Sequence, residues 1–165
     1  MLLRHNSRSW NKQRAKILNF ISHYGEKRIT MATLHSLRAL SDEQLNYQPS
    51  SDIVPASVVT FSDQGKLMGV GYAIGDGSGH CLIVVRPEAR RNGVGFQIMK
   101  ELINTLDHFS CQVAVDNIAS LALCFKNGLH AVSMFKGPTG KATLRFERSS
   151  VHGAATVRNS NTISQ

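Results

Sequence analysis

The apolar residues in the first part of the chain recur at helical spacing. Between residues 10 and 24 they return every three or four positions with basic residues between them, which predicts an amphipathic helix. These residues are Trp10, Ile17, Phe20, Ile21 and Tyr24. A short strand over residues 2–4 is expected before it. Met31, Leu34, Leu37 and Leu40 indicate a second helix, and the capping-box sequence of residues 41–44 a short third one.

The pattern then changes to strand-like runs. Residues 56–61 and 66–74 are rich in strand-forming residues, and residues 62–65 between them have turn chemistry, so an antiparallel hairpin is expected. The run at 81–85, Cys-Leu-Ile-Val-Val, is apolar without alternation. It predicts a central strand covered on both faces, ended by Pro87.

The second half of the chain predicts a strand-helix-strand unit. Residues 93–108 carry an apolar stripe at helical spacing, and residues 109–115 alternate as a strand. The strands at 81–85 and 109–115 should therefore be parallel. A helix over 118–127 follows, stopped by a glycine. Its expected apolar side is Ile118, Leu121, Ala122 and Phe125.

The chain ends in a predicted hairpin and a polar segment. Residues 130–135 and 141–148 form the expected hairpin, whereas residues 149–165 hold few large apolar side chains and predict a flexible tail. We therefore expect one α/β (α+β) domain over residues 1–148, with a mixed, mostly antiparallel sheet of about seven strands and flanking helices.

Composition fits a soluble globular domain. The chain has 165 residues, of which 42% are hydrophobic and 18% charged, values typical of a folded protein with a conventional core. Its three cysteines form neither a disulfide framework nor a metal-binding pair in the sequence. The start lacks the apolar core of a signal peptide, and no run is long enough to span a bilayer. A cytoplasmic protein with no membrane partner is expected.

Positive charge gathers at the amino-terminal end. The formal net charge is +8, and residues 1–40 contain eight Lys or Arg against a single acid, Glu26. A basic face of this kind favours nucleic acid, an anionic cofactor or an acidic partner. The alternative is a solvated helix face that keeps the protein soluble.

The segment over residues 85–95, VRPEARRNGVG, points to phosphate chemistry. It leaves the predicted buried strand and enters a helix through a loop with two glycines and several arginines. Free N–H groups and the positive dipole end at a helix N-terminus favour a bound phosphate. Gly93 and Gly95 allow the backbone to approach the ligand closely.

This segment resembles the signature of the GCN5-related N-acetyltransferase (GNAT) family, Q/R-x-x-G-x-G/A. The chain supplies it as Arg90-Arg91-Asn92-Gly93-Val94-Gly95, and the wider phrase V-x-P-x-x-R is matched at Val85, Pro87 and Arg90. A second resemblance follows downstream, where a strand ending at Asn117 precedes an alanine-containing helix and Gly128-Leu129, with leucine in place of the family's usual phenylalanine.

The resemblance implies a GNAT fold with a splayed fourth and fifth strand pair and acetyl-CoA as cosubstrate. A primary amine would attack the thioester directly, with a backbone N–H of the fourth strand facing the carbonyl oxygen. Asn117 also fits a helix N-cap. The residues implied in cofactor binding are Ile83, Val84, Val85, Arg90, Arg91, Asn92, Gly93, Val94, Gly95, Phe96 and Asn117.

The chain departs from the family at the catalytic positions. Many members have a tyrosine seven residues after the Asn that protonates the leaving thiolate, and this chain has Cys124, a candidate general acid or a packing cysteine. No carboxylate lies in residues 81–85 to act as general base. His80 and Asp76 are the nearest candidates, and each also fits a turn; the alternatives are water as the base, or no base if the amine arrives neutral.

Other chemistries and partners can be weighed from the same residues. The glycine spacing over residues 69–79 does not match a Rossmann site, and the histidines show no metal-binding spacing, so no metal is expected. Two hypotheses remain. The first is an N-acetyltransferase for an amine acceptor, where the basic helices favour an acidic or nucleic-acid-linked acceptor and a small amine or a protein lysine stays open. The second is a CoA-binding GNAT protein with little turnover that works through partner contacts of its basic helices. Either would be a monomer or a homodimer.

Overall fold

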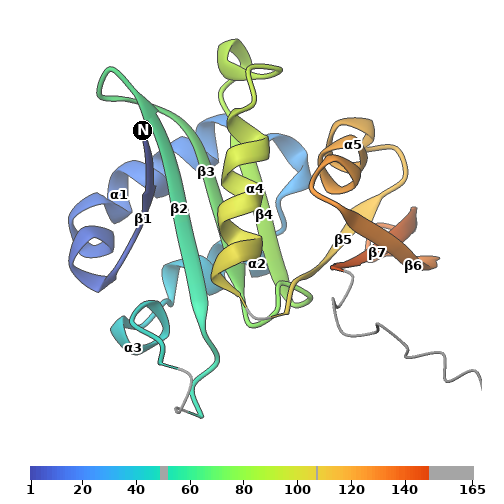
Figure 1. The fold of residues 1–165 in the computed structure, drawn as a ribbon, viewed down its shortest axis with the longest axis horizontal. Helices are drawn as coiled ribbons and strands as arrows, with labels where there is room; N and C mark the ends of the chain where they lie inside the picture. The colour runs from blue at the N-terminus through green and yellow to red at the C-terminus, as the bar shows by residue number, and fades with distance from the viewer. Residues whose placement is uncertain (49–51, 107, 149–165) are drawn as a thin grey trace, which may run out of the picture.

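The computed structural model of the chain describes residues 1–48, 52–106 and 108–148, and the predicted tail lies outside this range. The described chain forms seven strands and five α-helices (Figure 1). In order they are β1 Leu2–Arg4, α1 Ser7–Tyr24, the 3₁₀ turn η1 Glu26–Arg28, α2 Met31–Arg38, α3 Asp42–Leu45, β2 Ala56–Asp63, β3 Lys66–Ile74, β4 His80–Val85, the 3₁₀ turn η2 Pro87–Ala89, α4 Val94–Thr105, β5 Ser110–Ala114, α5 Ile118–Lys126, β6 Leu129–Lys136 and β7 Ala142–Arg148.

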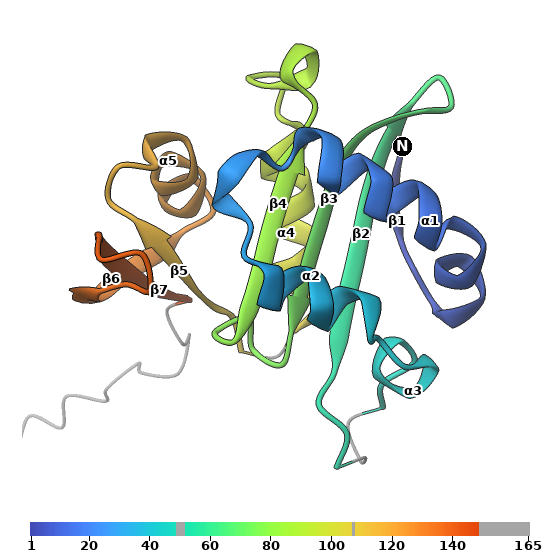
Figure 2. The same cartoon turned by 180° about the vertical axis from the view of Figure 1, so that it is seen from behind.

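The strands form two antiparallel sheets rather than one. The first has the order β1-β2-β3-β4 and the second β5-β7-β6, with no hydrogen-bonded ladder between β4 and β5 among the described residues. The two strands start together, because Ser110 N donates to Asp76 O at 2.7 Å, and then diverge toward their carboxyl ends (Figure 2). This is the splayed strand pair that the family resemblance implies.

Helices cover both faces of the first sheet. Helix α4 lies on one face, and α1 and α2 lie on the other (Figures 1 and 2). Side chains of β4 divide between the two cores: Leu82 and Val84 pack with α1 and α2, whereas Cys81, Ile83 and Val85 pack on the core that holds α4. The prediction that this strand is covered on both faces is confirmed, but β4 is the edge strand of the first sheet and not a central one.

Two glycines on β3 set the distance of α4 from the sheet. A Cβ at Gly69 would lie 2.7 Å from Ile98 Cδ1 and 2.9 Å from Val94 Cγ1, and one at Gly71 would overlap Ile98 Cγ2. Only hydrogen fits under the helix at these positions. The glycine-rich stretch that failed to match a nucleotide-binding motif thus has a packing role.

The predicted β2–β3 hairpin is confirmed, and its turn is tighter than expected. Asp63 pairs with Lys66, so Gln64 and Gly65 alone form the turn, with φ of 46° and 76°. Two positive φ angles match a type I′ turn, whose twist suits a hairpin. The third helix is also confirmed, with a capping box between Ser41 and Gln44.

The predicted buried side of α5 is wrong. Ile118 is 68% exposed and Phe125 56%, whereas Cys124 is fully buried. Leu121 and Leu123 are partly buried against the core. The apolar stripe predicts the wrong face because the helix covers only a three-stranded sheet and the flank of α4, which leaves much of its surface in water.

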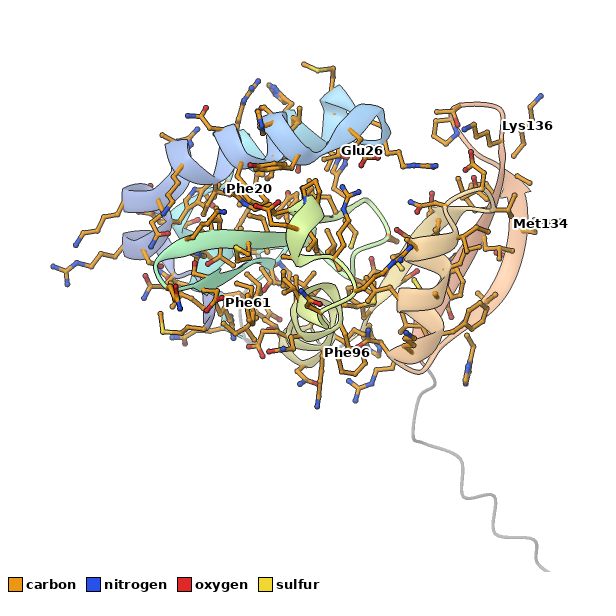
Figure 3. The ribbon with its side chains drawn as sticks, turned by 90° about the horizontal axis from the view of Figure 1, so that it is seen from above. Phe20, Glu26, Phe61, Phe96, Met134 and Lys136 are labelled. Carbon is orange, nitrogen blue, oxygen red and sulfur yellow. The ribbon has the colours of Figure 1, made fainter. Side chains whose placement is uncertain are left out.

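The second sheet ends in an exposed strand. Every residue of β6 after Leu129 is exposed, and Met134 and Lys136 project at the edge of the molecule (Figure 3). In the described part of the chain, no helix is both long and apolar enough to cross a membrane.

Candidate active site

The open edge of β4 faces the gap between the two sheets. Arg86 N donates to Met68 O on β3. Because the direction of the main-chain groups alternates along an antiparallel strand, the N–H and C=O groups of Val84 and Leu82 also point to β3. The intervening residues, Ile83 and Val85, therefore direct their main-chain groups to the side where β5 diverges. An extended ligand can add there as an extra strand.

Val84 has a different place from its neighbours. Its main chain belongs to the set that pairs with β3, opposite Val70, and its side chain is 4% exposed among the residues that face α1 and α2. Of the three β4 residues predicted to contact a cofactor, Ile83 and Val85 lie at the open edge and Val84 does not.

The loop after β4 ends at an open helix terminus. Gly93 is the N-cap of α4 with φ 78° and ψ 0°, a left-handed conformation that favours glycine. Arg91 also has positive φ, 66°. The first main-chain hydrogen bond of the helix runs from Gln97 N to Gly93 O at 3.0 Å, so the N–H groups just before Gln97 lie at the positive end of the helix dipole.

Gly95 lies at the mouth of the gap. A Cβ placed there would be 3.5 Å from Val85 Cγ2 and 3.6 Å from Leu123 Cδ2, an ordinary contact distance. Because Val85 is on β4 and Leu123 on α5, this glycine stands between the two halves of the molecule. A methyl group fits, whereas a large side chain would enter the gap.

The side chain of Arg90 is held by protein groups. Its Nε donates to Val85 O at 3.1 Å and its Nη2 pairs with Glu26 Oε1 at 2.8 Å. The Arg90–Glu26 pair joins the loop to the turn after α1, where Figure 3 labels Glu26. Both side chains are about half exposed, so the pair stabilises the loop only slightly.

The remaining loop residues differ in exposure. Arg91 and Asn92 are exposed, Val94 is buried with its side chain in the α4 core, and Phe96 is 37% exposed. Figure 3 shows Phe96 of α4 and Phe20 of α1 on opposite sides of the first sheet. Val94 can thus offer only its main chain to a ligand.

Asn117 caps α5. Its Oδ1 accepts from Ser120 N at 3.3 Å, the N-cap role that the sequence left open beside cofactor contact. The residue is partly exposed at the end of β5, on the side of the gap opposite Val85.

The thiol of Cys124 is in the core. Its Sγ lies 3.7 Å from Cys111 Sγ of β5, and the two side chains are 0% and 3% exposed. The hydrogen bond to Cys124 and burial raise the pKa of Cys111, and that hydrogen bond lowers the pKa of Cys124 against the effect of burial. A thiol with no exposed surface cannot protonate a group in the gap without a rearrangement, so this arrangement favours the packing role.

His80 and Asp76 lie at the other end of β4 from the glycine loop. His80 is the first residue of the strand rather than part of the turn, and its Nδ1 lies 3.2 Å from Thr33 Oγ1 of α2. Asp76 accepts from Ser78 N at 2.8 Å, a turn contact that lowers the pKa of its carboxyl group.

An ion-pair bridge that the sequence did not reveal crosses the carboxyl end of β5. Asp116 pairs with Arg28 at 3.2 Å and with Lys141 at 2.5 Å, which lowers the pKa of Asp116. Arg28 belongs to the turn after α1 and Lys141 to the β6–β7 connection. The three residues are far apart in sequence, so only the fold brings them together.

Sequence comparison places the chain in a family. The model of the acetyltransferase (GNAT) family matches residues 26–129, more than half of the chain and the part that holds β4, the glycine loop and α5. The chain therefore belongs to the GNAT acetyltransferase family. Comparison with curated protein sequences found no match.

Solved structures of distant sequence share the fold. The protein yncA from Salmonella typhimurium, solved with its cofactor acetyl-CoA, has a TM-score of 0.60 at 14% identity, covering 93% of this chain and 96% of that one. Aminoglycoside acetyltransferase AAC(6')-Ib in complex with coenzyme A gives 0.59 at 11%, covering 90% and 94%. A spermidine N-acetyltransferase SpeG chimera from Vibrio cholerae and hSSAT gives 0.58 at 16%, covering 89% and 94%.

Proposed function

We propose that the protein transfers an acetyl group from acetyl-CoA to a primary amine by direct attack in a ternary complex. The observation that supports this most strongly is the continuity of two features: the open edge of β4 leads into a glycine loop at the N-terminus of α4. A strand edge suits the amide-rich pantetheine arm, and an open helix terminus suits a pyrophosphate.

In this proposal the main chain does most of the binding. The N–H groups of residues 91–95 hold the pyrophosphate, with Arg91 supplying charge, and Ile83 and Val85 pair with the pantetheine arm. Because Val85 O already accepts from Arg90, Val85 offers only its N–H. Asn117 faces the arm from the β5 side.

The transfer step needs little from side chains. A neutral amine nitrogen attacks the thioester carbon, the C–S bond breaks as the C–N bond forms, and coenzyme A leaves as the thiolate. A β4 main-chain N–H stabilises the charge that develops on the carbonyl oxygen. The buried position of Cys124 leaves solvent as the proton source for the thiolate.

His80 is the proposed general base. Its ring is oriented by Thr33, whose hydroxyl also lies 2.9 Å from Thr30 Oγ1. His80 lies about 16 Å along the strand from Val85, given the rise of about 3.3 Å per residue in a β-strand. An amine that binds at the start of β4 would meet this ring, and one that binds nearer the loop would lose its proton to water.

A second function, coenzyme A binding with little turnover, is favoured by the two catalytic departures. Strand β4 carries no carboxylate, and the thiol at the position of the usual acid is buried. Acetyl-CoA consumption, measured against a panel of anionic, neutral and cationic amines, separates the two functions. Turnover with any of them supports transfer, and binding without turnover supports the second function.

Cofactor binding is tested with paired variants at Gly95. Acetyl-CoA at a hundredfold excess over Kd should stabilise the wild-type protein by about 2.7 kcal/mol. Gly95→Ala should keep this shift, because the added methyl meets its neighbours at 3.5 Å or more. Gly95→Leu should lose it while the apo protein still unfolds cooperatively. A full shift in Gly95→Leu would contradict the proposed site.

A further inference from the structure

Helix α1 carries a stripe of cations on one face. Its 18 residues include four Lys or Arg and no acid. Arg8, Lys12 and Lys16 follow at intervals of four, and Asn19 and His23 continue the line within about 80° of arc, with successive cations about 6 Å apart along the axis. We call Arg8, Lys12 and Lys16 the α1 stripe.

The α1 stripe has no acidic partner. Among residues 1–48, 52–106 and 108–148, no ion pair involves Arg8, Lys12 or Lys16, and all three are exposed. The fourth cation, Arg14, is on the other side of the helix and donates to the Arg38 carbonyl of α2. The charge of Arg14 is therefore not part of the α1 stripe.

The stripe ends in a groove that combines cations and rings. The groove has a volume of about 540 Å³ and its lining includes Lys16, Phe20, His23, Tyr24, Lys66 and Arg86. The Arg86 guanidinium lies 4.7 Å from the centre of the Tyr24 ring, and His23 packs edge-on against Tyr24 with centroids 4.5 Å apart. His23 is exposed, so a planar group can stack beside it.

Few acids oppose these cations. Glu88 pairs with Lys66 at 3.1 Å and with Arg86 at 3.3 Å, and so lowers the charge at the far wall of the groove. Glu26, beyond the end of the helix, pairs with Arg90. Asp42 accepts from Asn11 on the other side of α1. The stripe itself keeps its full charge.

We propose that the α1 stripe and the groove bind a single-stranded nucleic acid, with phosphates along Arg8, Lys12 and Lys16 and a base beside His23. Cations in line with an aromatic platform at their end are what a single strand requires. A membrane surface fits less well, because the large apolar residues of α1, Trp10, Ile17, Phe20 and Ile21, are buried in the core and leave no face to insert.

The position of the groove connects this surface to the acetyl site. Helix α1 crosses the sheet and ends beside the end of β4 (Figure 2), and its next turn contacts the glycine loop through Glu26 and Arg90. A single-stranded nucleic acid bound along the α1 stripe would therefore reach the mouth of the gap between β4 and β5. Given the proposed acetyl-transfer function, an amine carried on a nucleic acid is then the acceptor class that fits.

Binding is measured with a labelled single-stranded RNA oligonucleotide over a series of salt concentrations. Each phosphate contact adds about 0.7 to the slope of log affinity against log salt. Replacing Arg8, Lys12 and Lys16 together with Gln should lower the slope by about 2 and the affinity at 0.1 M salt by about 100-fold. Arg14→Gln, which removes one charge off the line, should change affinity less than twofold, and His23→Ala should weaken binding at least fivefold.

The controls separate this surface from the acetyl site. The triple variant should keep the acetyl-CoA stability shift, and Gly95→Leu should keep RNA binding. Poly-glutamate should bind far more weakly than RNA, because it has no bases to stack. No RNA binding at low salt, equal affinity for poly-glutamate, or an equal loss per charge in Arg14→Gln would each overturn the proposal.

Discussion

A methyl group at Gly71 tests how α4, which carries the glycine loop, is seated on the sheet. Its Cβ would overlap Ile98 Cγ2 and lie 3.1 Å from Leu102 Cδ1, and all three residues are fully buried. Ile98 is β-branched and cannot swing its Cγ2 away without leaving its rotamer. The helix or the strand must move instead.

Overpacking of this kind costs about 1–3 kcal/mol. Gly71→Ala should therefore lower the free energy of unfolding by about 2 kcal/mol, which corresponds to about 4–8 °C in Tm for a chain of this size. Acetyl-CoA binding should weaken as well, since a displaced α4 moves the loop at residues 91–95. Urea denaturation followed by circular dichroism gives the stability change directly.

Two further variants make this measurement decisive. The control is Gly79→Ala, in the loop between β3 and β4, where an added Cβ has no neighbour within 4 Å. It should change the free energy of unfolding by less than about 0.5 kcal/mol. The double variant Gly71→Ala with Ile98→Ala should be about 1 kcal/mol more stable than the sum of the two single changes predicts, because the shortened side chain makes room for the added methyl. If Gly71→Ala proved as stable as Gly79→Ala, the close packing of α4 on β3 would be refuted.

Other substitutions test the burial of single groups. Cys124→Ala should cost about 1 kcal/mol of stability and leave acetyl-CoA consumption within about twofold of wild type, whereas a tenfold loss of turnover would make the thiol an acid after all. Tyr72→Phe removes a buried hydroxyl that lies 2.7 Å from Ser36 Oγ of α2, and should lower the urea midpoint by the equivalent of about 1 kcal/mol. Burial lowers the pKa of His5, so stability should fall as the pH drops below about 6.5, and His5→Gln should flatten that dependence; an unchanged slope would exclude His5 as its cause.

Local patterns predicted the elements of the fold well. The hairpin of β2 and β3 follows from strand-forming runs on either side of a short polar turn, and β4 from an unbroken apolar run. Element ends were less accurate: α4 stops at Thr105, and the extended Leu106 follows it although the apolar stripe continues to that residue. The stripe extends further than the helix because Leu106 is buried in the core although its backbone is extended.

Long-range contacts were beyond a sequence-based prediction. The glycine loop is recognisable from Arg90 to Gly95, yet the partner of Arg90, Glu26, is 64 residues away and gives no local signal. The same holds for Cys124, whose position seven residues after Asn117 made it a candidate acid but could not show that it would be buried against Cys111. Spacing predicts which residues share a helix face, and the tertiary fold decides what that face meets.

In the proposed complex, acetyl-CoA lies between β4 and β5 with its pyrophosphate at the N-terminus of α4. The most direct measurement is a titration of acetyl-CoA into isotope-labelled protein with the backbone amide signals followed by NMR. We expect the largest shifts at Ile83, Val85 and the amides of residues 91–95, with little change along β6. Shifts centred on β6 or α3, or unchanged amides at Gly93 and Gly95 when the protein is saturated, would contradict it.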